Sequence, residues 1–337
     1  LPGRPSDRRS PSSGKTPLFR EASPLPGSLA ITFTPLASVG GLAFAQSIAL
    51  TATTAYIVDW PTGDLAATSA LSAAIECRLP LGSRIYGVAA QGNHVYVADP
   101  RDDGSRLWVL AAAPEITPTL VASLTVPGEA MQPVAQTRTI SDLLYLAAGT
   151  AGLHVIDVTQ PQTPTLLANL DTRGSATAAA VHDNFVYLAD RTTGLVIVDI
   201  TDPTQPQLTG TLPIPGTPLG VTAAVTGSRA LAYVAAGLGG VAVVDVTDPA
   251  APHLLRTYAT TSAANSVLLD GTILYVAAGW QGVLALDVSH PDAPYLLGSY
   301  DSPGYAYGLQ LAGDQLLVAG GEGGLQRLQV TRVPGPP

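Results

Sequence analysis

Short apolar runs separated by turn residues recur along most of the chain, and their lengths predict strands rather than helices. Around residue 187 the runs cover residues 176–181, 185–190, 194–200 and 207–212. They are rich in Val, Ile, Leu and Tyr and are bounded by Gly, Pro, Asp and Asn, which is typical of strands. The third run is apolar on both faces, so we expect that strand to be buried between neighbouring sheets.

The four-run pattern repeats along the sequence. Four segments align without gaps: 145–170, 187–212, 233–258 and 275–300. The tyrosines that open them are spaced 42, 46 and 42 residues apart, and an aspartate inside each segment keeps the same spacing. Weaker copies at Tyr56, Tyr96 and Leu317 bring the number of units to seven. Seven units of four strands predict an all-β fold, a seven-bladed β-propeller with four-stranded blades, over residues 28–332.

The two ends of the repeat array predict how the ring closes. The last unit has three runs and stops before a fourth, whereas residues 27–43 match the pattern of residues 118–131 in the second unit. We therefore expect an N-terminal strand to complete the last blade and to pair its open edge. Residues 1–27, rich in Pro, Ser and Arg, are expected to form a disordered tail, and residues 333–337 a C-terminal tail.

Charge and composition restrict the classes of partner that the protein can bind. The net charge is −9, and because residues 1–26 carry +3, the remaining residues carry −12. An acidic body, in a chain with a single lysine, argues against a nucleic-acid partner, which requires clustered basic residues. No window of 18 residues is continuously apolar, so no membrane span is expected. Cys77 is the only cysteine, which leaves no basis for a disulfide framework.

The third and fourth runs of several units also carry a family signature. The segments GLVIVDITDP, GVAVVDVTDP and GLHVIDVTQP resemble the LVIVD-repeat family of bacterial propeller proteins. The resemblance covers about residues 28–332, is strongest in units three to six, and is weakest in unit one, which lacks the run after Tyr56. It implies a propeller in a protein that is secreted or held at the cell surface, although the chain shows no clear signal peptide. It implies no enzymatic activity.

The repeated aspartates are better explained by structure than by chemistry. Each precedes a turn with Thr or Ser, and a carboxylate there accepts backbone N–H bonds. Recurrence in successive units favours a role in the scaffold over a ring of ligands. The aspartates are Asp157, Asp199, Asp245 and Asp287.

Departures from the repeat are the better candidates for a binding site. In four-stranded blades, the loops from the second to the third strand and from the fourth strand to the next blade share one face. Exposed Trp, Tyr and Arg are enriched in binding hot spots. Trp280 replaces a small residue in an AGxxG turn and has no evident packing role. The predicted ligand- or partner-binding residues are Trp60, Arg84, Tyr86, Arg173, Arg191, Trp280, Tyr305, Tyr307 and Glu322.

One loop offers carboxylates for a metal ion. Asp99, Asp102 and Asp103 are clustered, and calcium prefers such oxygen ligands. The spacing is not that of an EF-hand, and Arg101 and Arg106 offset the acids, so a solvated turn is the favoured interpretation. Calcium is the only cofactor that the sequence suggests.

The sequence favours a non-enzymatic binding module that recognises a protein or glycan through its loop face. No residue is assigned a catalytic role, because the chain has no nucleophile elbow, phosphate loop or paired-carboxylate motif. A hydrolase or lyase at the channel mouth is the alternative, with Arg84, Arg173, Arg191 and Glu322 as its candidate groups. A structural module of a larger cell-surface protein is the third hypothesis. The oligomeric state is not indicated.

Overall fold

The computed structural model describes residues 29–334, apart from 61, 70, 71, 73, 83, 102, 103, 113–115, 130, 132, 138–141 and 227. The described residues form 28 β-strands and their connecting turns. None of them belongs to a helix long and apolar enough to cross a membrane. The expected tail at residues 1–27 lies outside the described residues.

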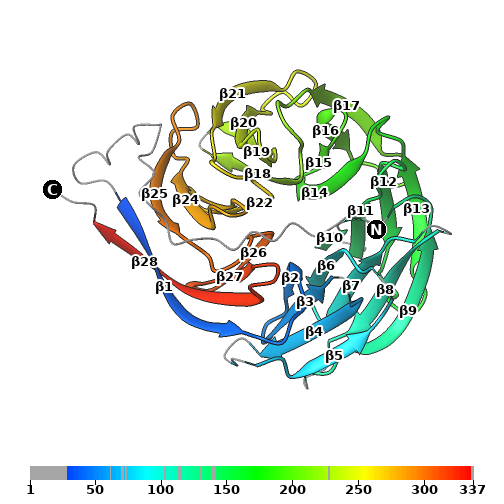
Figure 1. Cartoon of the computed structure of the whole chain (residues 1–337). Coiled ribbons are helices and arrows are strands. Elements are labelled where there is room, and N and C mark those ends of the chain that lie inside the picture. The colour runs from blue at the N-terminus through cyan, green and yellow to red at the C-terminus, as the bar shows by residue number, and fades with distance from the viewer. Residues whose placement is uncertain are drawn as a thin grey trace, which may run out of the picture.

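The strands form seven four-stranded antiparallel sheets, the blades of the ring in Figure 1. Blades 1 to 3 comprise β2 (Ala45–Leu50), β3 (Thr54–Asp59), β4 (Asp64–Ser69), β5 (Cys77–Pro80), β6 (Gly87–Gln91), β7 (His94–Asp99), β8 (Ser105–Ala111), β9 (Thr119–Val126), β10 (Pro133–Thr137), β11 (Asp142–Ala147), β12 (Leu153–Asp157) and β13 (Thr165–Leu170). Blades 4 to 6 comprise β14 (Ala176–His182), β15 (Phe185–Asp190), β16 (Gly194–Asp199), β17 (Gln207–Leu212), β18 (Gly220–Thr226), β19 (Arg229–Ala235), β20 (Val241–Asp245), β21 (His253–Tyr258), β22 (Ser266–Asp270), β23 (Ile273–Ala277), β24 (Val283–Asp287) and β25 (Tyr295–Tyr300). Blade 7 comprises β26 (Gly308–Ala312), β27 (Gln315–Ala319), β28 (Leu325–Pro334) and β1 (Leu29–Val39). The predicted seven-bladed β-propeller is confirmed.

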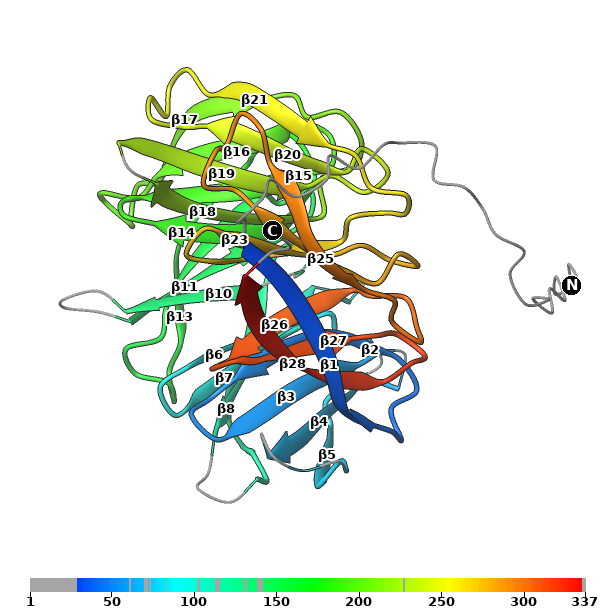
Figure 2. The same ribbon diagram turned by 90° about the vertical axis from the view of Figure 1, so that its left-hand side faces the viewer.

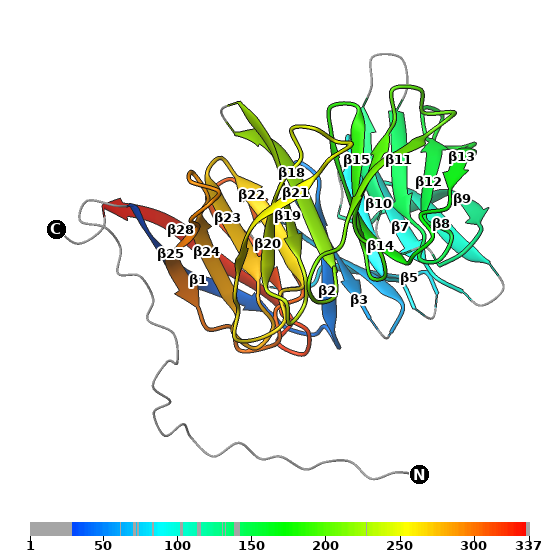
Figure 3. The same cartoon turned by 90° about the horizontal axis from the view of Figure 1, so that it is seen from above.

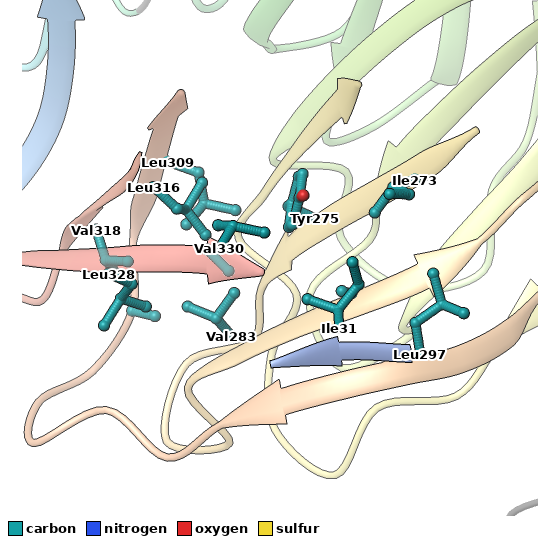
Figure 4. Close-up of a cluster of buried hydrophobic side chains, with 13 residues drawn as sticks. Ile31, Ile273, Tyr275, Val283, Leu297, Leu309, Leu316, Val318, Leu328 and Val330 are labelled. Carbon is teal, nitrogen blue, oxygen red and sulfur yellow. The ribbon is translucent and has the colours of Figure 1, made fainter. Parts of the chain in front are cut away.

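The ring closes through the N-terminal strand, as predicted. β1 pairs antiparallel with β28 from Leu29↔Pro334 to Val39↔Leu325, and Figures 2 and 3 show these two strands side by side although they come from opposite ends of the chain. β28 therefore continues to Pro334, two residues beyond the expected end of the propeller at 332, because β1 offers it partners there. Ile31 of β1 is 4% exposed and lies among apolar side chains of blades 6 and 7 (Figure 4).

The repeat tyrosines fill the spaces between blades. Tyr187, on the second strand of blade 4, packs with Val221 and Ala232 of blade 5, and Tyr145, Tyr233 and Tyr275 pack against the next blade in the same way. Large aromatic side chains bury much apolar area, so this position contributes strongly to the contact between blades. Burial raises the pKa of the equivalent Tyr96 to about 12, so its hydroxyl stays neutral at physiological pH.

The repeated aspartates stabilise turns, as predicted. The N–H groups of Thr159, Thr201, Thr247 and Ser289 donate to the preceding aspartate carboxylates at 2.7–2.9 Å. Just before these aspartates, and at the equivalent point of blade 2, the pairing of the third and fourth strands changes register. Such bulges increase the local twist and protect an outer edge from pairing with another sheet.

The AGxxG turns join neighbouring blades through the backbone. Gly237 and Ala264 of the next blade exchange two N–H···O bonds of 2.9 Å, and the equivalent glycines of blades 3, 6 and 7 form the same bridge. Gly237 has φ +57°, a left-handed conformation that non-glycine residues adopt at a cost. Glycine is therefore required at this position for the bridge to form without strain.

Blades 1, 2 and 4 use a buried aspartate at the residue before this position. Asp59, Asp99 and Asp190 are all 0% exposed. Asp190 accepts four hydrogen bonds, from Thr172 Oγ1 and from the N–H groups of Ser175, Thr192 and Thr193, at 2.8–2.9 Å. The carboxylate thus ties together the two loops at one end of the blade.

Candidate functional site

The loop face consists of the turns from the second to the third strand of each blade and the links from one blade to the next. All nine residues predicted for partner binding lie in these segments. Trp60, Arg191, Trp280 and Glu322 follow the second strands of their blades, and the others lie in the links between blades. Their role in binding stays a prediction.

Five aromatic rings form a continuous chain across this face, which we call the aromatic arc: Trp280, Tyr305, Tyr307, Phe44 and Trp60. Successive ring centroids are 5.3, 4.6, 5.0 and 5.6 Å apart, with interplanar angles of 87°, 43°, 53° and 64°. Edge-to-face and tilted contacts at these distances are favourable for aromatic pairs. The arc joins blades 6, 7 and 1, so it exists only because the ring is closed.

Backbone contacts hold both ends of the arc in place. Phe44 N–H donates to the buried carboxylate of Asp59 at 2.7 Å, and Trp60 N–H donates to the Phe44 carbonyl at 3.0 Å. At the other end Trp280 is 60% exposed, and its N–H donates to Ser262 Oγ at 3.1 Å. A Cβ on Gly279 would lie 2.8 Å from the Tyr305 ring, so only glycine allows that ring to take its place.

One equivalent position of each repeat lines the propeller axis. In blades 2, 5, 6 and 7 this position directly precedes the first paired residue of the innermost strand, and in blades 1 and 4 it is the residue skipped at a register shift. It is occupied by Gln46, Tyr86, Thr177, Leu219, Asn265 and Tyr307. These six side chains surround an axial cavity of about 270 Å³. The equivalent residue of blade 3, Gln132, lies outside the described residues.

Hydrogen bonds between blades fix this wall. The Thr177 hydroxyl shares its hydrogen between the Ala189 carbonyl of its own blade, at 3.0 Å, and the Pro218 carbonyl in the link to blade 5, at 3.1 Å. Asn265 Nδ2 donates to the Ala306 carbonyl, which precedes blade 7, at 2.8 Å. Burial raises the pKa of Tyr307, and the neighbouring Tyr305, Tyr86 and Glu322 raise it further. The wall is therefore polar but uncharged at neutral pH, apart from Arg191, which also lines the cavity.

A wider cavity of about 600 Å³ opens beside the axis, and we call it the mouth. Tyr86, Met131 and Arg191 line both the mouth and the axial cavity, so the two are adjacent. Trp60, the last ring of the aromatic arc, also lines the mouth. Volumes of about 300–1,000 Å³ are typical of small-molecule sites.

The charged side chains of the mouth differ in their pairing. Arg101 contacts Asp99 through Nε and Nη2 at 2.7 and 2.6 Å. Arg84 and Arg191 are exposed and form no ion pair with any described residue. The side chain of Glu129 lies over Gly149, where its Oε2 is 3.2 Å from the place of a Cβ.

The groups proposed for an enzyme converge only in part. Arg84 and Arg191 line the mouth, but Arg173 and Glu322 line neither cavity. Arg173 is exposed at the tip of the link before β14, with φ +59° and its N–H bonded to Asp171. A catalytic set of these four residues is therefore not assembled.

The carboxylate of Asp99 is engaged in its own loop. It accepts bonds from Arg101 and from Trp108 Nε1, the latter at 3.2 Å. Asp102 and Asp103 lie outside the described residues, so the calcium site stays a prediction. Within the described part of the chain, no group of three or more His, Cys, Asp or Glu side chains is placed to hold a metal ion.

His154 supports the link that carries Met131 and Glu129. Its side chain is 0% exposed, and Nε2 donates to the Pro127 carbonyl at 2.8 Å. Protonation would add a hydrogen at Nδ1, which is buried and has no acceptor among the described residues. Burial accordingly lowers the pKa of His154, and the hydrogen bond to Pro127 only partly opposes this effect.

This pKa predicts acid sensitivity. Below about pH 6.5 the unfolded chain binds a proton at His154 that the folded protein resists, so the free energy of unfolding falls by up to about 1.4 kcal/mol per pH unit. Urea denaturation at about pH 7.5 and 5.5 measures the loss. The variant His154→Gln removes the pH dependence that comes from His154. Glutamine is the residue that blade 7 has at the equivalent position, Gln326. Equal pH dependence of the variant and the wild type would refute the assignment.

The LVIVD repeat model matches four consecutive stretches of the sequence: residues 141–172, 173–212, 224–260 and 262–302. These stretches contain blades 4 and 6 completely, blade 3 without β10, and blade 5 without the first part of β18. The chain is a β-propeller with LVIVD repeats. Blades 1, 2 and 7 of this LVIVD-repeat propeller lie outside the matched residues, in agreement with the weaker repeats expected there.

Solved structures share the fold of the LVIVD-repeat propeller. The crystal structure of Sqt1 from Saccharomyces cerevisiae matches with a TM-score of 0.63 and 8% identity, over 90% of this chain and 100% of that chain. The computationally designed Ika8 protein matches with a TM-score of 0.59 and 14% identity, over 88% and 99%. At such identities the likeness concerns the fold alone. No curated protein matches the sequence.

Sequence reasoning missed one ring of the aromatic arc and most of the axial wall. Phe44 was not predicted for the loop face because it stands alone in an uncharged stretch, before the first complete repeat. Gln46, Thr177, Leu219 and Asn265 lie at a single repeat position whose residue changes from blade to blade. That variation, next to positions that hardly change, is the signal that an alignment of the seven units contains.

Proposed function

We propose that this LVIVD-repeat propeller is a non-catalytic binding module that recognises a protein partner through the loop face. The aromatic arc supports this proposal most directly. It places five aromatic side chains on one face, beside a cavity, and Trp280 at its end is largely exposed. Buried aromatic anchors beside a pocket contribute most of the affinity in many protein interfaces.

The arrangement of the rings favours a protein over a glycan. A sugar ring stacks best on a broad, exposed aromatic face. Tyr305, Tyr307, Phe44 and Trp60 are each partly buried and packed against one another at steep angles, so they offer edges and small hollows. Apolar side chains of a partner fit such a surface better than flat sugar rings do.

Selection of peptides tests the proposal. We expect a phage-displayed random peptide library to yield peptides that bind the propeller and lose at least about tenfold in affinity with Trp280→Ser, since aromatic anchors contribute about 2 kcal/mol or more. Leu254→Ser is the matched control, because Leu254 is also an exposed apolar residue but lies on outer strand β21.

Two results would contradict the proposal. Selected peptides that bind the Trp280→Ser variant as well as the wild type would place recognition elsewhere. A glycan array that gives face-dependent binding, with no peptide selected, would replace the protein partner by a glycan.

A further inference from the structure

Two arginines of the mouth, Arg84 and Arg191, have no ion-pair partner among the described residues, a property shared by Arg106, Arg173 and Arg256. Most of the others have a partner: Arg78 pairs with Asp59, Arg101 with Asp99, Arg229 with Asp245 and Asp292, Arg332 with Asp270, while Arg327 donates to Ser72 O and Gln315 Oε1. Arg84 and Arg191 have no acidic partner within the described part of the chain, although the body of the protein carries an excess of acidic residues. Among the described residues, no ion pair therefore competes with a ligand for these two side chains.

The two arginines line the same cavity, the mouth, from different blades. Arg84 lies in the link before β6 of blade 2, and Arg191 follows β15 of blade 4. Both line the mouth, and Arg191 also reaches the axial cavity. Arg101 is neutralised by Asp99, so the described residues that line the mouth retain an excess of positive charge even with Glu129 counted against it.

This charge suits a carboxylate. The planar guanidinium group presents paired donors that match the two oxygens of a carboxylate, and it loses its hydration more readily than an ammonium group does. Met131, Tyr86 and Trp60 line the same cavity and provide apolar area around the charged group. A doubly charged phosphate fits less well, because the excess positive charge of the mouth is small and the surrounding body is acidic.

We propose that the mouth binds an acidic side chain of the protein partner, with Arg84 and Arg191 as the groups that receive its carboxylate. This inference rests on the proposed function and specifies its chemistry. The aromatic arc ends in the mouth at Trp60, so apolar residues that flank the acidic side chain lie along the arc while the carboxylate enters the cavity.

Capped pentapeptides test this assignment. The probes are fluorescently labelled acetyl-Glu-Leu-Glu-Phe-Glu-amide and its counterpart with Gln in place of each Glu, followed by anisotropy at about 50 mM NaCl to limit screening. We expect the Glu peptide to bind at least about tenfold more tightly than the Gln peptide. The Arg84→Gln/Arg191→Gln double variant abolishes this difference. Arg229→Gln, which removes a paired arginine of the opposite face, preserves it.

Glutarate provides a second arm that distinguishes a free acid from an acidic side chain. Glutarate binding that requires Arg84 and Arg191, together with no binding of the Glu peptide, would show that the mouth takes a free acid. That result would overturn the acidic side chain of a protein as the occupant. Equal binding of the Glu and Gln peptides, unchanged binding by the double variant, or no binding of the Glu peptide at about 1 mM also overturns the inference.

The outcome is distinguishable from a failure of the proposed function. Phage-selected peptides that depend on Trp280 but are indifferent to Arg84→Gln/Arg191→Gln would leave the loop face as the binding surface and remove only the carboxylate site. Absence of any peptide that depends on the loop face would remove both.

Discussion

A chain that lacks β1, residues 29–39, will not unfold as one cooperative unit. β1 contributes ten residue pairs to β28 and covers its edge. Its removal exposes Leu297, Leu328 and Val330, which pack with Ile31 in the cluster between blades 6 and 7. The lost pairing and burial exceed the net stability of about 5–15 kcal/mol that a typical domain has, so we expect a partly unfolded, aggregating protein.

Calorimetry and size-exclusion chromatography measure this outcome, with a chain that begins at residue 29 as the control. The milder variant Ile31→Ala remains folded and loses about 2–4 kcal/mol, because it leaves a cavity between blades 6 and 7. If the chain without β1 unfolds in one transition at the temperature of the control, closure by this strand does not stabilise the ring.

Replacing Asp190 will cause the largest loss expected from a single polar substitution. In Asp190→Ala the N–H groups of Ser175, Thr192 and Thr193 lose their acceptor in a partly buried turn. A buried polar group left unpaired costs about 1–3 kcal/mol, so we expect a total loss of about 3–5 kcal/mol. The turn cannot adopt the backbone bridge of the other blades, because Pro218 stands at the equivalent position of blade 5 and has no N–H.

The matched control is Asp199→Ala, which removes a carboxylate that accepts one backbone N–H in an exposed turn. We expect a loss of about 1 kcal/mol or less there. Urea denaturation of both variants gives the comparison. Equal losses for the two aspartates would show that burial and the number of bonds do not determine their contribution.

Much of the fold was predictable because the repeat supplies the same information several times. In blade 4 the four runs read from the sequence differ from β14 to β17 by at most one residue at an end. The burial of the third strands and the packing of the tyrosines between blades could be predicted from the pattern of apolar residues within each repeat. The end of β28 was placed two residues early, because its last pairs depend on β1, which is about 300 residues away in the chain.

The site was predictable only in its residue types. Loop position was enough to propose Trp60, Trp280, Tyr305 and Tyr307, but their contact through Phe44 depends on the closure of blade 7 onto blade 1. Position within the repeat decides which charged residues line the mouth. Arg84 and Arg191 line the mouth, whereas Arg173 and Glu322 occupy the tips of a link and a turn and point to no cavity that the other two share.

Hydrogen exchange of the propeller, measured with and without a phage-selected peptide, tests the binding face most directly. If the peptide binds the loop face, backbone amides around Phe44, Trp60 and Tyr305 become protected, while the turns after Asp199 and Asp245 on the opposite face do not. Protection confined to those turns, or to the outer strands β17 and β21, would contradict binding at the loop face.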